Sequence, residues 1–273
     1  MTTLTLDIDI DQVSALIRET AETEILPRFQ RLDAADIRHK SGPQDLVTAA
    51  DLAAEERLSR ALRAHLPGST VVGEEGVFAD PALLERLRGQ GTIWIVDPID
   101  GTTNFTEGRP EFAVIVGLVQ DGTIVAGWIH DVLAGETVVA ARGSGAWIGG
   151  RRLSVLAPAP FERMTGAVYV GAKRAPQLHE RAKALRPLMA ARSYLRSAGA
   201  EYLALVRGVS HYALFTRLMP WDHVAGYLIH AEAGGFAACL GGAPYRPWPI
   251  EGALLLAPDR ATWDALAERF TAA

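Results

Sequence analysis

The segment over residues 94–105 constrains this chain most, because it joins an apolar strand to two aspartates across a proline. Residues 92–96 are all β-branched or aromatic and predict a buried strand that ends in Asp97. Pro98 fixes its own φ and biases Asp97 toward an extended conformation, so a turn there can aim the carboxylates of Asp97 and Asp100 at one point. Two such carboxylates repel each other, and a bound divalent cation with oxygen ligands removes the conflict.

The next residues, Gly-Thr-Thr-Asn at 101–104, supply a flexible turn with hydroxyl groups and backbone amides. Amides in such a turn, or at a helix start, form an anion-binding nest. Carboxylates beside a nest fit metal ions that bridge the protein to a phosphate, which is an arrangement for phosphoryl transfer. Each feature alone is also ordinary turn chemistry, because Asp-Pro and Asp-Gly pairs are common in turns.

Two other segments place acids at the ends of predicted elements. Glu74 and Glu75 follow a short strand over residues 70–72, and Asp222 stands immediately before a helix that begins near His223. Taken singly, a Glu-Glu pair after a strand is usually a solvated loop, and Asp222 is an ordinary N-cap. Together with residues 94–105, these acids favour one shared site.

The hydrophobic pattern predicts helices first, then strands, then an alternation of both. Helices are expected over residues 13–29 and 51–66, the second with Thr48 as N-cap, and strands over 70–72, 92–96, 112–119, 123–129 and 137–141. The second half alternates strands at 166–170, 212–215, 236–239 and 253–257 with helices at 177–191, at 202–207, after Trp221 and after Pro258. This order predicts layers of helix and sheet, with an antiparallel sheet first and a mixed α/β part after it.

Two prolines, Pro158 and Pro160, interrupt regular structure and mark a candidate linker. We therefore expect an N-terminal α+β part over residues 1–155, which carries the antiparallel sheet and most of the acidic site. A C-terminal α/β part over 156–273 would carry Asp222 and the substrate contacts. The two parts are expected to pack as one compact unit.

Composition excludes several function classes. Lys and Arg number 27 against 32 Asp and Glu, and the formal net charge of −5 argues against a general nucleic-acid-binding face. The single cysteine, Cys239, excludes an internal disulfide and a multi-cysteine zinc site. The N-terminus is acidic where a signal peptide is basic, and no run approaches the roughly 20 apolar residues that span a bilayer. We expect a soluble cytoplasmic protein that binds neither nucleic acid nor membrane.

Several motifs in a fixed order carry a resemblance to a known family. They lie at residues 45–51, 73–75, 94–105, 221–222 and 232–235. The chain resembles the inositol monophosphatase family, which are magnesium-dependent, lithium-sensitive phosphomonoesterases. The resemblance implies an α/β (α+β) fold, a layered αβαβα sandwich of the inositol monophosphatase and fructose-1,6-bisphosphatase type. It also implies a homodimer.

The family resemblance also implies a role for each motif residue. Carboxylates and one carbonyl would bind Mg²⁺, from Glu74, Asp97, Ile99, Asp100 and Asp222. Thr102 and Glu74 would orient and help deprotonate a water that attacks phosphorus in line, with activation by the metal. Asp51 would support Thr102, and Lys40 would lie near the metals. Phosphate oxygens would be held at Gly101 and Thr102, beside Asp100.

The substrate side departs from the family pattern. Inositol-selective members have an acid seven positions before the last metal aspartate, and Phe215 stands there in this chain. The segment with Gly199, Ala200 and Glu201 lies where the family contacts substrate, and Glu201 is a candidate to replace the missing acid. Arg217 is a candidate for a second anionic group of the substrate. Equally, Glu201 is a residue that the helix dipole favours at a helix start, and Arg217 is an ordinary solvated side chain.

These observations give a leading hypothesis and its alternatives. The leading one is a Mg²⁺-dependent phosphomonoesterase that acts on a small metabolite such as an inositol, sugar, polyol or histidinol phosphate. The alternative within the fold is a 3′(2′),5′-bisphosphate nucleotidase or a fructose-1,6-bisphosphatase. A non-catalytic binding member is disfavoured, because all four metal-binding acids of the family pattern are present.

Overall fold

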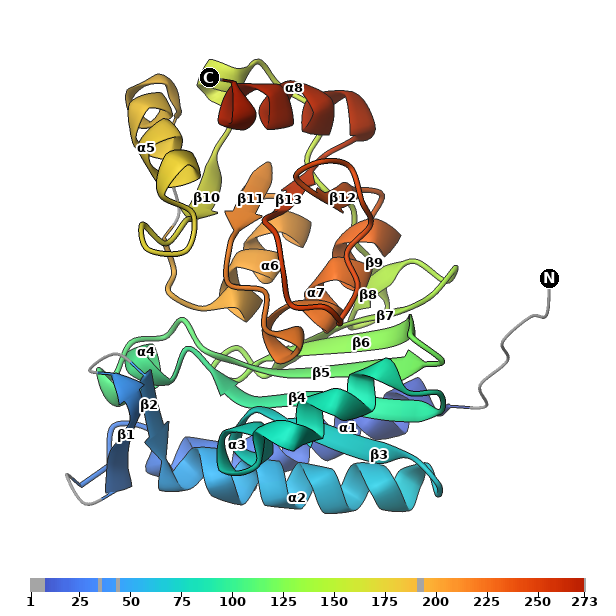
Figure 1. Ribbon diagram of the computed structural model, residues 1–273. Coiled ribbons are helices and arrows are strands. Elements are labelled where there is room, and N and C mark those ends of the chain that lie inside the picture. Colours follow the sequence, from blue (N-terminus) through green and yellow to red (C-terminus); the bar gives the residue numbers. More distant parts are fainter. Residues whose placement is uncertain (1–7, 34–35, 43–44, 191–193, 273) are drawn as a thin grey trace.

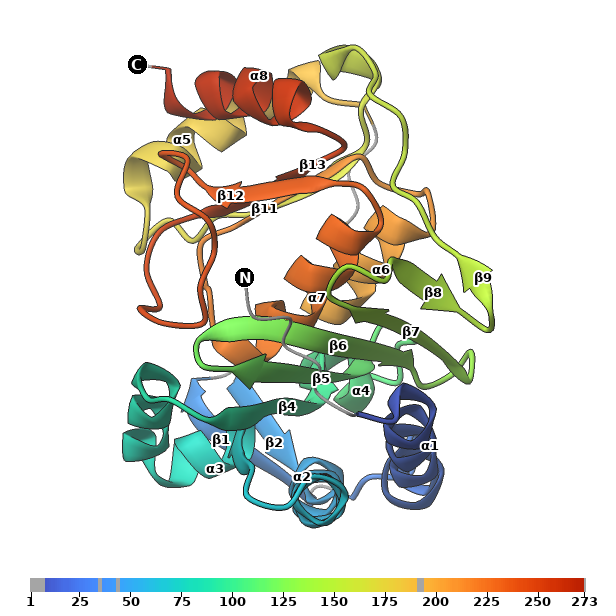
Figure 2. The same ribbon diagram turned by 90° about the vertical axis from the view of Figure 1, so that its right-hand side faces the viewer.

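The computed structural model describes residues 8–33, 36–42, 45–190 and 194–272. Its helices and sheets stack as five alternating layers, which Figure 2 shows edge-on. From one side to the other these are a helix pair, a seven-stranded sheet, a second helix pair, a four-stranded sheet and a third helix pair (Figure 1). The three pairs are α1 (Ile10–Thr20) with α2 (Ala49–His65), α6 (Ala198–Val206) with α7 (Pro220–Glu232), and α5 (Pro176–Leu185) with α8 (Arg260–Thr271). This confirms the expected αβαβα sandwich.

The larger sheet has the strand order β3-β4-β5-β6-β7-β8-β9. Its strands are β3 (Thr70–Gly73), β4 (Thr92–Asp100), β5 (Ala113–Gln120), β6 (Thr123–Asp131), β7 (Glu136–Ala141), β8 (Ala146–Ile148) and β9 (Arg151–Arg152). All neighbours pair antiparallel except β3 and β4, which are parallel. The predicted antiparallel first sheet is therefore confirmed except at β3, which pairs parallel because α3 (Glu74–Ala79) and the segment after it carry the chain back to start β4 in the same direction.

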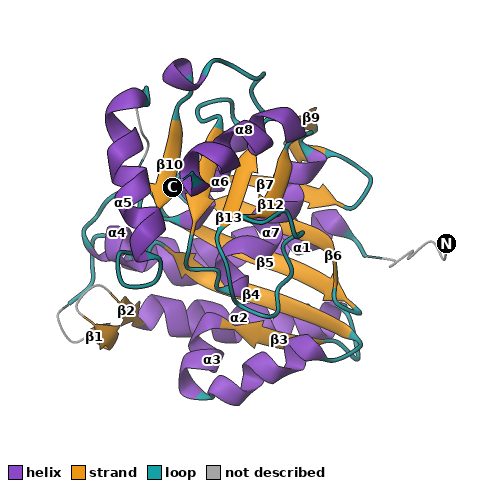
Figure 3. Ribbon diagram, turned by 45° about the horizontal axis from the view of Figure 1, so that its top comes forward, coloured by secondary structure: helices purple, strands orange, loops and turns teal. Residues whose placement is uncertain are grey.

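The smaller sheet has the order β10-β11-β13-β12 and lies beneath α5 and α8 (Figure 3). Its strands are β10 (Gly166–Tyr169), β11 (Tyr212–Phe215), β12 (Phe236–Cys239) and β13 (Leu254–Ala257). The pair β10–β11 is parallel and the other two pairs are antiparallel. The strands at 212–215 and 236–239 have the predicted bounds.

Two glycines of the larger sheet let α7 pack directly on β5 and β6. A Cβ at Gly117 would lie 2.6 Å from the side chain of Val224, and one at Gly127 would lie 2.7 Å from the Cα of Ala225. Real Cβ atoms do not make contacts this short, so only glycine admits the helix at this depth. This close packing fixes the helix that carries Asp222.

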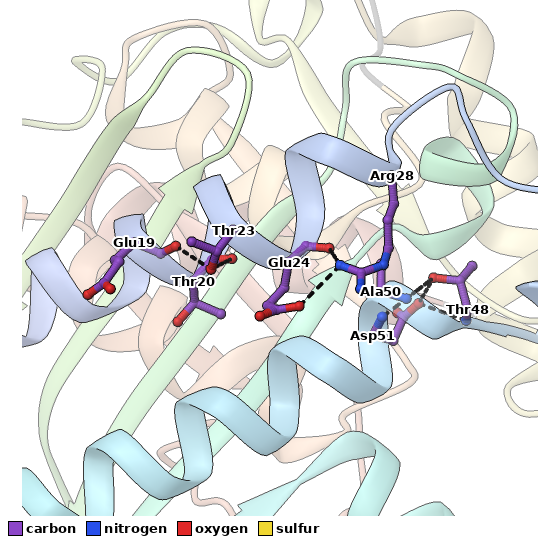
Figure 4. Close-up of polar contacts among 8 residues, drawn as sticks. All are labelled: Glu19, Thr20, Thr23, Glu24, Arg28, Thr48, Ala50 and Asp51. Carbon is purple, nitrogen blue, oxygen red and sulfur yellow. Dashed lines mark hydrogen bonds and ion pairs between the residues drawn. The ribbon is translucent and has the colours of Figure 1, made fainter.

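Helix α2 begins where the sequence places it. Thr48 is its N-cap and forms a capping box, in which Thr48 Oγ1 accepts the N–H groups of Ala50 and Asp51 and the Asp51 carboxylate accepts the Thr48 N–H. Figure 4 shows these contacts at the first turn of the helix. The cap also fixes the direction of the Asp51 side chain.

Shorter elements complete the described chain. They are the hairpin of β1 (Ile37–Gly42) and β2 (Asp45–Thr48), the helices α3 (Glu74–Ala79) and α4 (Thr102–Thr106), a π-helical turn at Ala21–Ile25 and 3₁₀ segments at Leu26–Arg28, Pro81–Arg88, Phe161–Arg163 and Arg186–Leu188. The predicted helix over 13–29 is thus three segments, α1, the π-helical turn and a 3₁₀ turn that contains Pro27.

The chain passes from the larger to the smaller sheet between Arg152 and Gly166, and the predicted division at 155/156 falls in this connection. One core cluster runs through both sheets, from Val72 to Leu256, with α6 and α7 between them. Among the described helices, none combines the length and apolar character needed to cross a membrane.

Candidate active site

A bulge in β4 brings Asp97 and Asp100 to one face of the larger sheet. Asp97 pairs with Ile115 and Asp100 with Ala113, so β4 advances three positions while β5 advances two. Side chains alternate between the faces of a strand, and one extra residue reverses the alternation. The strand therefore does not end at Asp97, as the sequence suggested, but continues to Asp100, and the two carboxylates converge through the bulge.

Asp222 reaches the same point from α7. The sequence predicts Asp222 immediately before the helix. The helix instead begins at Pro220, so Asp222 lies in its first turn. Asp97, Asp100 and Asp222 each offer one carboxylate oxygen, and these three oxygens lie within 4.8 Å of one another. Such a group of hard oxygen donors can hold a divalent cation.

The start of α6 surrounds Asp100 with hydrogen-bond donors. The Ser197 hydroxyl and the Gly199 N–H, the latter at 2.7 Å, donate to Asp100 Oδ2, and the Ala198 N–H donates to Oδ1 at 3.1 Å. Burial nevertheless raises the pKa of Asp100 to about 6, these hydrogen bonds lower it, and the charge of Glu74 adds to the rise. Because burial disfavours the ionised form of Asp100, a cation beside it would stabilise that form.

Glu74 comes next to Asp97 through the parallel pairing of β3 and β4. Gly73 is paired with Val96, and both strands run in the same direction. The next residue of each strand, Glu74 and Asp97, therefore lies beside the other. Glu74 begins α3 and lines the same cavity as the three aspartates, but it is not part of their 4.8 Å group.

Thr102 stands between the Asp51 carboxylate and the Ile99 carbonyl. Its hydroxyl lies 3.2 Å from Asp51 Oδ1 and 3.0 Å from the Ile99 oxygen, and its one proton can serve one of them at a time. Asp51 is 1% exposed and is held by the Thr48 N–H at 2.8 Å and the Thr48 hydroxyl at 2.5 Å. The structure thus brings Asp51 to Thr102, although the two lie far apart in sequence.

Gly101 makes the turn from β4 into α4. Its φ is +91°, and a Cβ there would lie 2.8 Å from the Glu111 carbonyl and 3.0 Å from Ser197 Cβ. Both the backbone conformation and the close approach require glycine. Gly101 and Thr102 line the cavity, so their backbone passes directly beside the acidic group.

The cavity has a volume of about 310 Å³, and two kinds of side chain line it. Glu74 and the three aspartates are acidic. The lining also includes aromatic rings and two arginines, which are Tyr169, Tyr194, Arg196, Phe215, Arg217 and His223. Phe215, at the position of the expected acid, stacks between the rings of Tyr169 and Tyr202 at centroid distances of 5.4 and 5.8 Å.

The residues predicted to contact substrate differ in whether they line the cavity. Arg217 lines the cavity, but of the described cavity residues none is Gly199, Ala200 or Glu201. Gly199 binds Asp100, and Ala200 donates its N–H to Ser197 Oγ at 3.0 Å.

Glu201 is fully buried and is not among the described residues that line the cavity. It accepts the Tyr169 hydroxyl at 2.6 Å and the Leu195 N–H at 2.9 Å. Because α6 begins at Ala198, position 201 lies in the core, and a role for Glu201 as a substrate-reading acid stays a prediction. The backbone of Lys40 lies in β1, and its side chain lies outside the described residues.

The sequence alone assigns no role at the site to Ser197 or His223, and it favours a surface position for His223, which the structure buries. Ser197 is the N-cap of α6, which a Ser followed by Ala-Gly-Ala-Glu signals, and its hydroxyl binds Asp100. Burial lowers the pKa of His223 to about 4, so the ring is neutral. It lies 3.0 Å from the Tyr202 hydroxyl and 2.8 Å from the Arg217 carbonyl, to which its Nε2–H donates.

Comparison with known proteins agrees with this geometry. Residues 9–272 match the model of the inositol monophosphatase family. A fructose-1,6-bisphosphatase/inositol-1-monophosphatase of Thermotoga maritima is 32% identical over 211 residues, which is 76% of each chain. The Nus factor SuhB of Pseudomonas aeruginosa is 33% identical over 222 residues, 78% of this chain and 79% of its own.

Solved structures show the same architecture. The IMPase of Thermotoga maritima superposes with a TM-score of 0.81 at 26% identity, over 95% of both chains. The likeness covers both sheets and all three helix layers of the sandwich.

Proposed function

The chain belongs to the inositol monophosphatase family, a family of metal-dependent phosphatases, and from this premise we propose that it hydrolyses a small phosphomonoester with Mg²⁺ as its metal. The observation that carries the proposal is the convergence of Asp97, Asp100 and Asp222 to within 4.8 Å. These three carboxylates fit a hard cation, since their donors are oxygens and the burial of Asp100 favours a positive partner.

We assign the metal to the carboxylates of Asp97, Asp100, Asp222 and Glu74 and to the Ile99 carbonyl. When bound, Mg²⁺ lowers the pKa of a water and stabilises the entering and leaving oxygens of an in-line displacement. Thr102 and Glu74 would orient that water. With the Thr102 proton directed to Asp51, the hydroxyl oxygen is free to accept a hydrogen bond from the water and so to orient it.

The amides at Gly101 and Thr102, beside Asp100, are our candidates for the phosphate oxygens, because this backbone lines the cavity next to the acids. The place that we propose for Lys40, near the metals, rests on the family pattern alone. The same holds for a homodimer and for inhibition by lithium, whereas a cytoplasmic location stays the expectation drawn from the sequence.

A phosphate-release screen with and without Mg²⁺ tests the proposal. The panel contains inositol, sugar, polyol, histidinol and nucleotide phosphates, and each reaction is repeated with EDTA. We expect release on at least one substrate that EDTA abolishes. Failure on the whole panel would favour a non-catalytic binding role instead.

One observation favours a substrate with a second anionic group. Phe215 replaces the acid expected for polyol hydroxyls, and the arginines among the described residues that line the cavity are Arg196 and Arg217. Arg196 pairs with Glu107 at 2.9 Å, and Arg217, two positions after Phe215, is our candidate for the second anionic group. A guanidinium matches a phosphate or carboxylate in geometry and charge. A nucleoside or sugar bisphosphate is therefore our second candidate substrate class.

Arg217→Ala tests this second candidate. The ratio of kcat/KM for a bisphosphate to that for inositol 1-phosphate should fall about 10- to 100-fold, the worth of one hydrogen bond to a charged group. Arg174→Ala, which removes an exposed arginine outside the cavity lining, is the matched control. An unchanged ratio in Arg217→Ala would reject the second-anion assignment and leave the phosphatase proposal intact.

A further inference from the structure

Glu55 is a buried carboxylate that the chemistry above does not use. It lies on α2 one helical turn after Asp51, and it is 8% exposed. Residues four apart share one face of a helix, so Asp51 and Glu55 are presented together to the neighbouring strand ends. Asp51 reaches Thr102 after β4, and Glu55 reaches the turn after β3.

Each oxygen of Glu55 accepts one backbone amide from that turn. Oε2 accepts the Glu75 N–H at 2.8 Å, and Oε1 accepts the Gly76 N–H at 2.7 Å. These amides directly follow Glu74 and belong to the first turn of α3, which has no side-chain cap from Gly73. Bonds from N–H groups to a carboxylate are shorter and stronger than neutral ones, so Glu55 fixes this backbone at two points.

Gly73 packs directly against the Glu55 carboxylate. Its φ of −103° and ψ of 158° are extended and open to any residue, so the backbone does not require glycine there. A Cβ at position 73 would lie 2.3 Å from Glu55 Cδ and 2.4 Å and 2.6 Å from its two oxygens. The glycine therefore leaves room for the Glu55 carboxylate against the chain just before Glu74.

We propose that Glu55 is a positioning residue for Glu74. It holds the turn that carries Glu74 against the acidic group, as Asp51 holds Thr102 on the other side of the site. Glu55 itself lines no part of the cavity among the described residues, so it acts through the backbone of 74–76. The inference rests on the proposed metal-dependent function, because Glu74 is assigned there as a metal ligand.

Titration calorimetry with Mn²⁺, a Mg²⁺ substitute, tests the role without any measurement of activity. Glu55→Gln keeps the size of the side chain but turns an NH₂ group toward one of the two amides. We expect Mn²⁺ to bind about 10- to 100-fold more weakly, the usual effect of removing a residue that orients a ligand. The control is Glu56→Gln, the exposed neighbour that pairs with Arg60 at 3.7 Å, which should bind Mn²⁺ as wild type does.

Gly73→Ala gives a second, independent test. Alone it should displace the Glu55 carboxylate and weaken Mn²⁺ binding. In a Glu55→Ala background it should have no further effect, because the space is already vacant and an alanine suits the backbone. Additive losses in the double variant would show that position 73 acts without Glu55 and would overturn the inference.

The outcomes separate the two proposals. Wild-type Mn²⁺ affinity in Glu55→Gln, with only a lower melting temperature in EDTA, would reduce Glu55 to a structural residue and overturn the inference alone. A wild-type protein that binds no Mn²⁺ would overturn the proposed function and the inference with it. Glu55→Asp, which keeps both oxygens on a shorter chain, is measured in parallel and should bind with intermediate affinity.

Discussion

Ser197→Ala removes one hydroxyl that serves both the fold and the acidic group. Ser197 is 3% exposed, donates to Asp100, and accepts the Ala200 N–H at 3.0 Å as the N-cap of α6. Loss of a cap costs about 1 kcal/mol, and loss of a hydrogen bond to a charged group costs about 1.5–3 kcal/mol. With Asp100 ionised, we expect the free energy of unfolding to fall by about 2.5–4 kcal/mol.

The loss should depend on pH with a defined sign. Burial raises the pKa of Asp100 to about 6 from 3.8, so protonation favours the fold. This contribution is fully present below pH 3.8 and is lost as the pH rises through 6. At pH 5 the folded state holds Asp100 mostly protonated, and the Ser197 bond is then a neutral one worth about 0.5–1.5 kcal/mol. The destabilisation should therefore be about 1–2 kcal/mol smaller at pH 5 than at pH 8.

Urea unfolding in EDTA at both pH values measures this difference. Ser69→Ala is the matched control, since Ser69 is also buried and bonds to the Leu66 carbonyl at 2.6 Å and to Trp94 Nε1 at 3.1 Å, with no acid involved. The control should lose the same free energy at pH 5 and pH 8. An equal loss at both pH values in Ser197→Ala would refute the coupling between this hydroxyl and the charge of Asp100.

Two further predictions concern stability. His230 is fully buried, and burial lowers its pKa to about 3, so its folded-state pKa lies below the unfolded value of 6.5. Stability is then lost as the pH falls from 6.5 toward 3. His230→Leu should flatten this slope by about 1.4 kcal/mol per pH unit in the free energy of unfolding from urea titrations, and an unchanged slope would contradict the assignment. Gly101→Ala should cost more than about 1–3 kcal/mol in thermal unfolding, because it adds a clash with Glu111 to the strain of a positive φ. Gly122→Ala, at φ +74° with open space around it, should show the strain alone, and equal costs would exclude the clash.

The elements with strong local signals were predictable. The N-cap at Thr48 and the strands at 212–215 and 236–239 follow from capping chemistry and from short runs that are apolar or β-branched. The end of β4 was not predictable, because the bulge that carries the strand on to Asp100 exists only through its pairing with β5. The sequence predicts this helix only from residue 202, whereas α6 begins at Ala198, because Ala and Gly at 198–200 carry little hydrophobic pattern.

The acidic site also contains contacts that the local sequence predicts and contacts that it does not. Asp97 and Asp100 are close in sequence, so their convergence could be argued from a single segment. Ser197 lies 97 positions from Asp100, and Glu55 lies 20 positions from Glu75, so these contacts arise only when separate layers of the sandwich meet. Glu201 is the converse case, since the phase of α6 turns this carboxylate into the core, which the motif alone does not reveal.

The central claim is that the converged aspartates hold a metal that drives phosphate release, and Asp97→Asn tests it most directly. Asp97 is 1% exposed, and its Oδ1 accepts the Ile99 N–H at 3.1 Å, a bond that an asparagine oxygen can keep. The variant should therefore retain its circular dichroism spectrum while Mg²⁺-dependent phosphate release on the best substrate disappears. A folded Asp97→Asn protein that releases phosphate at the wild-type rate would contradict the metal assignment.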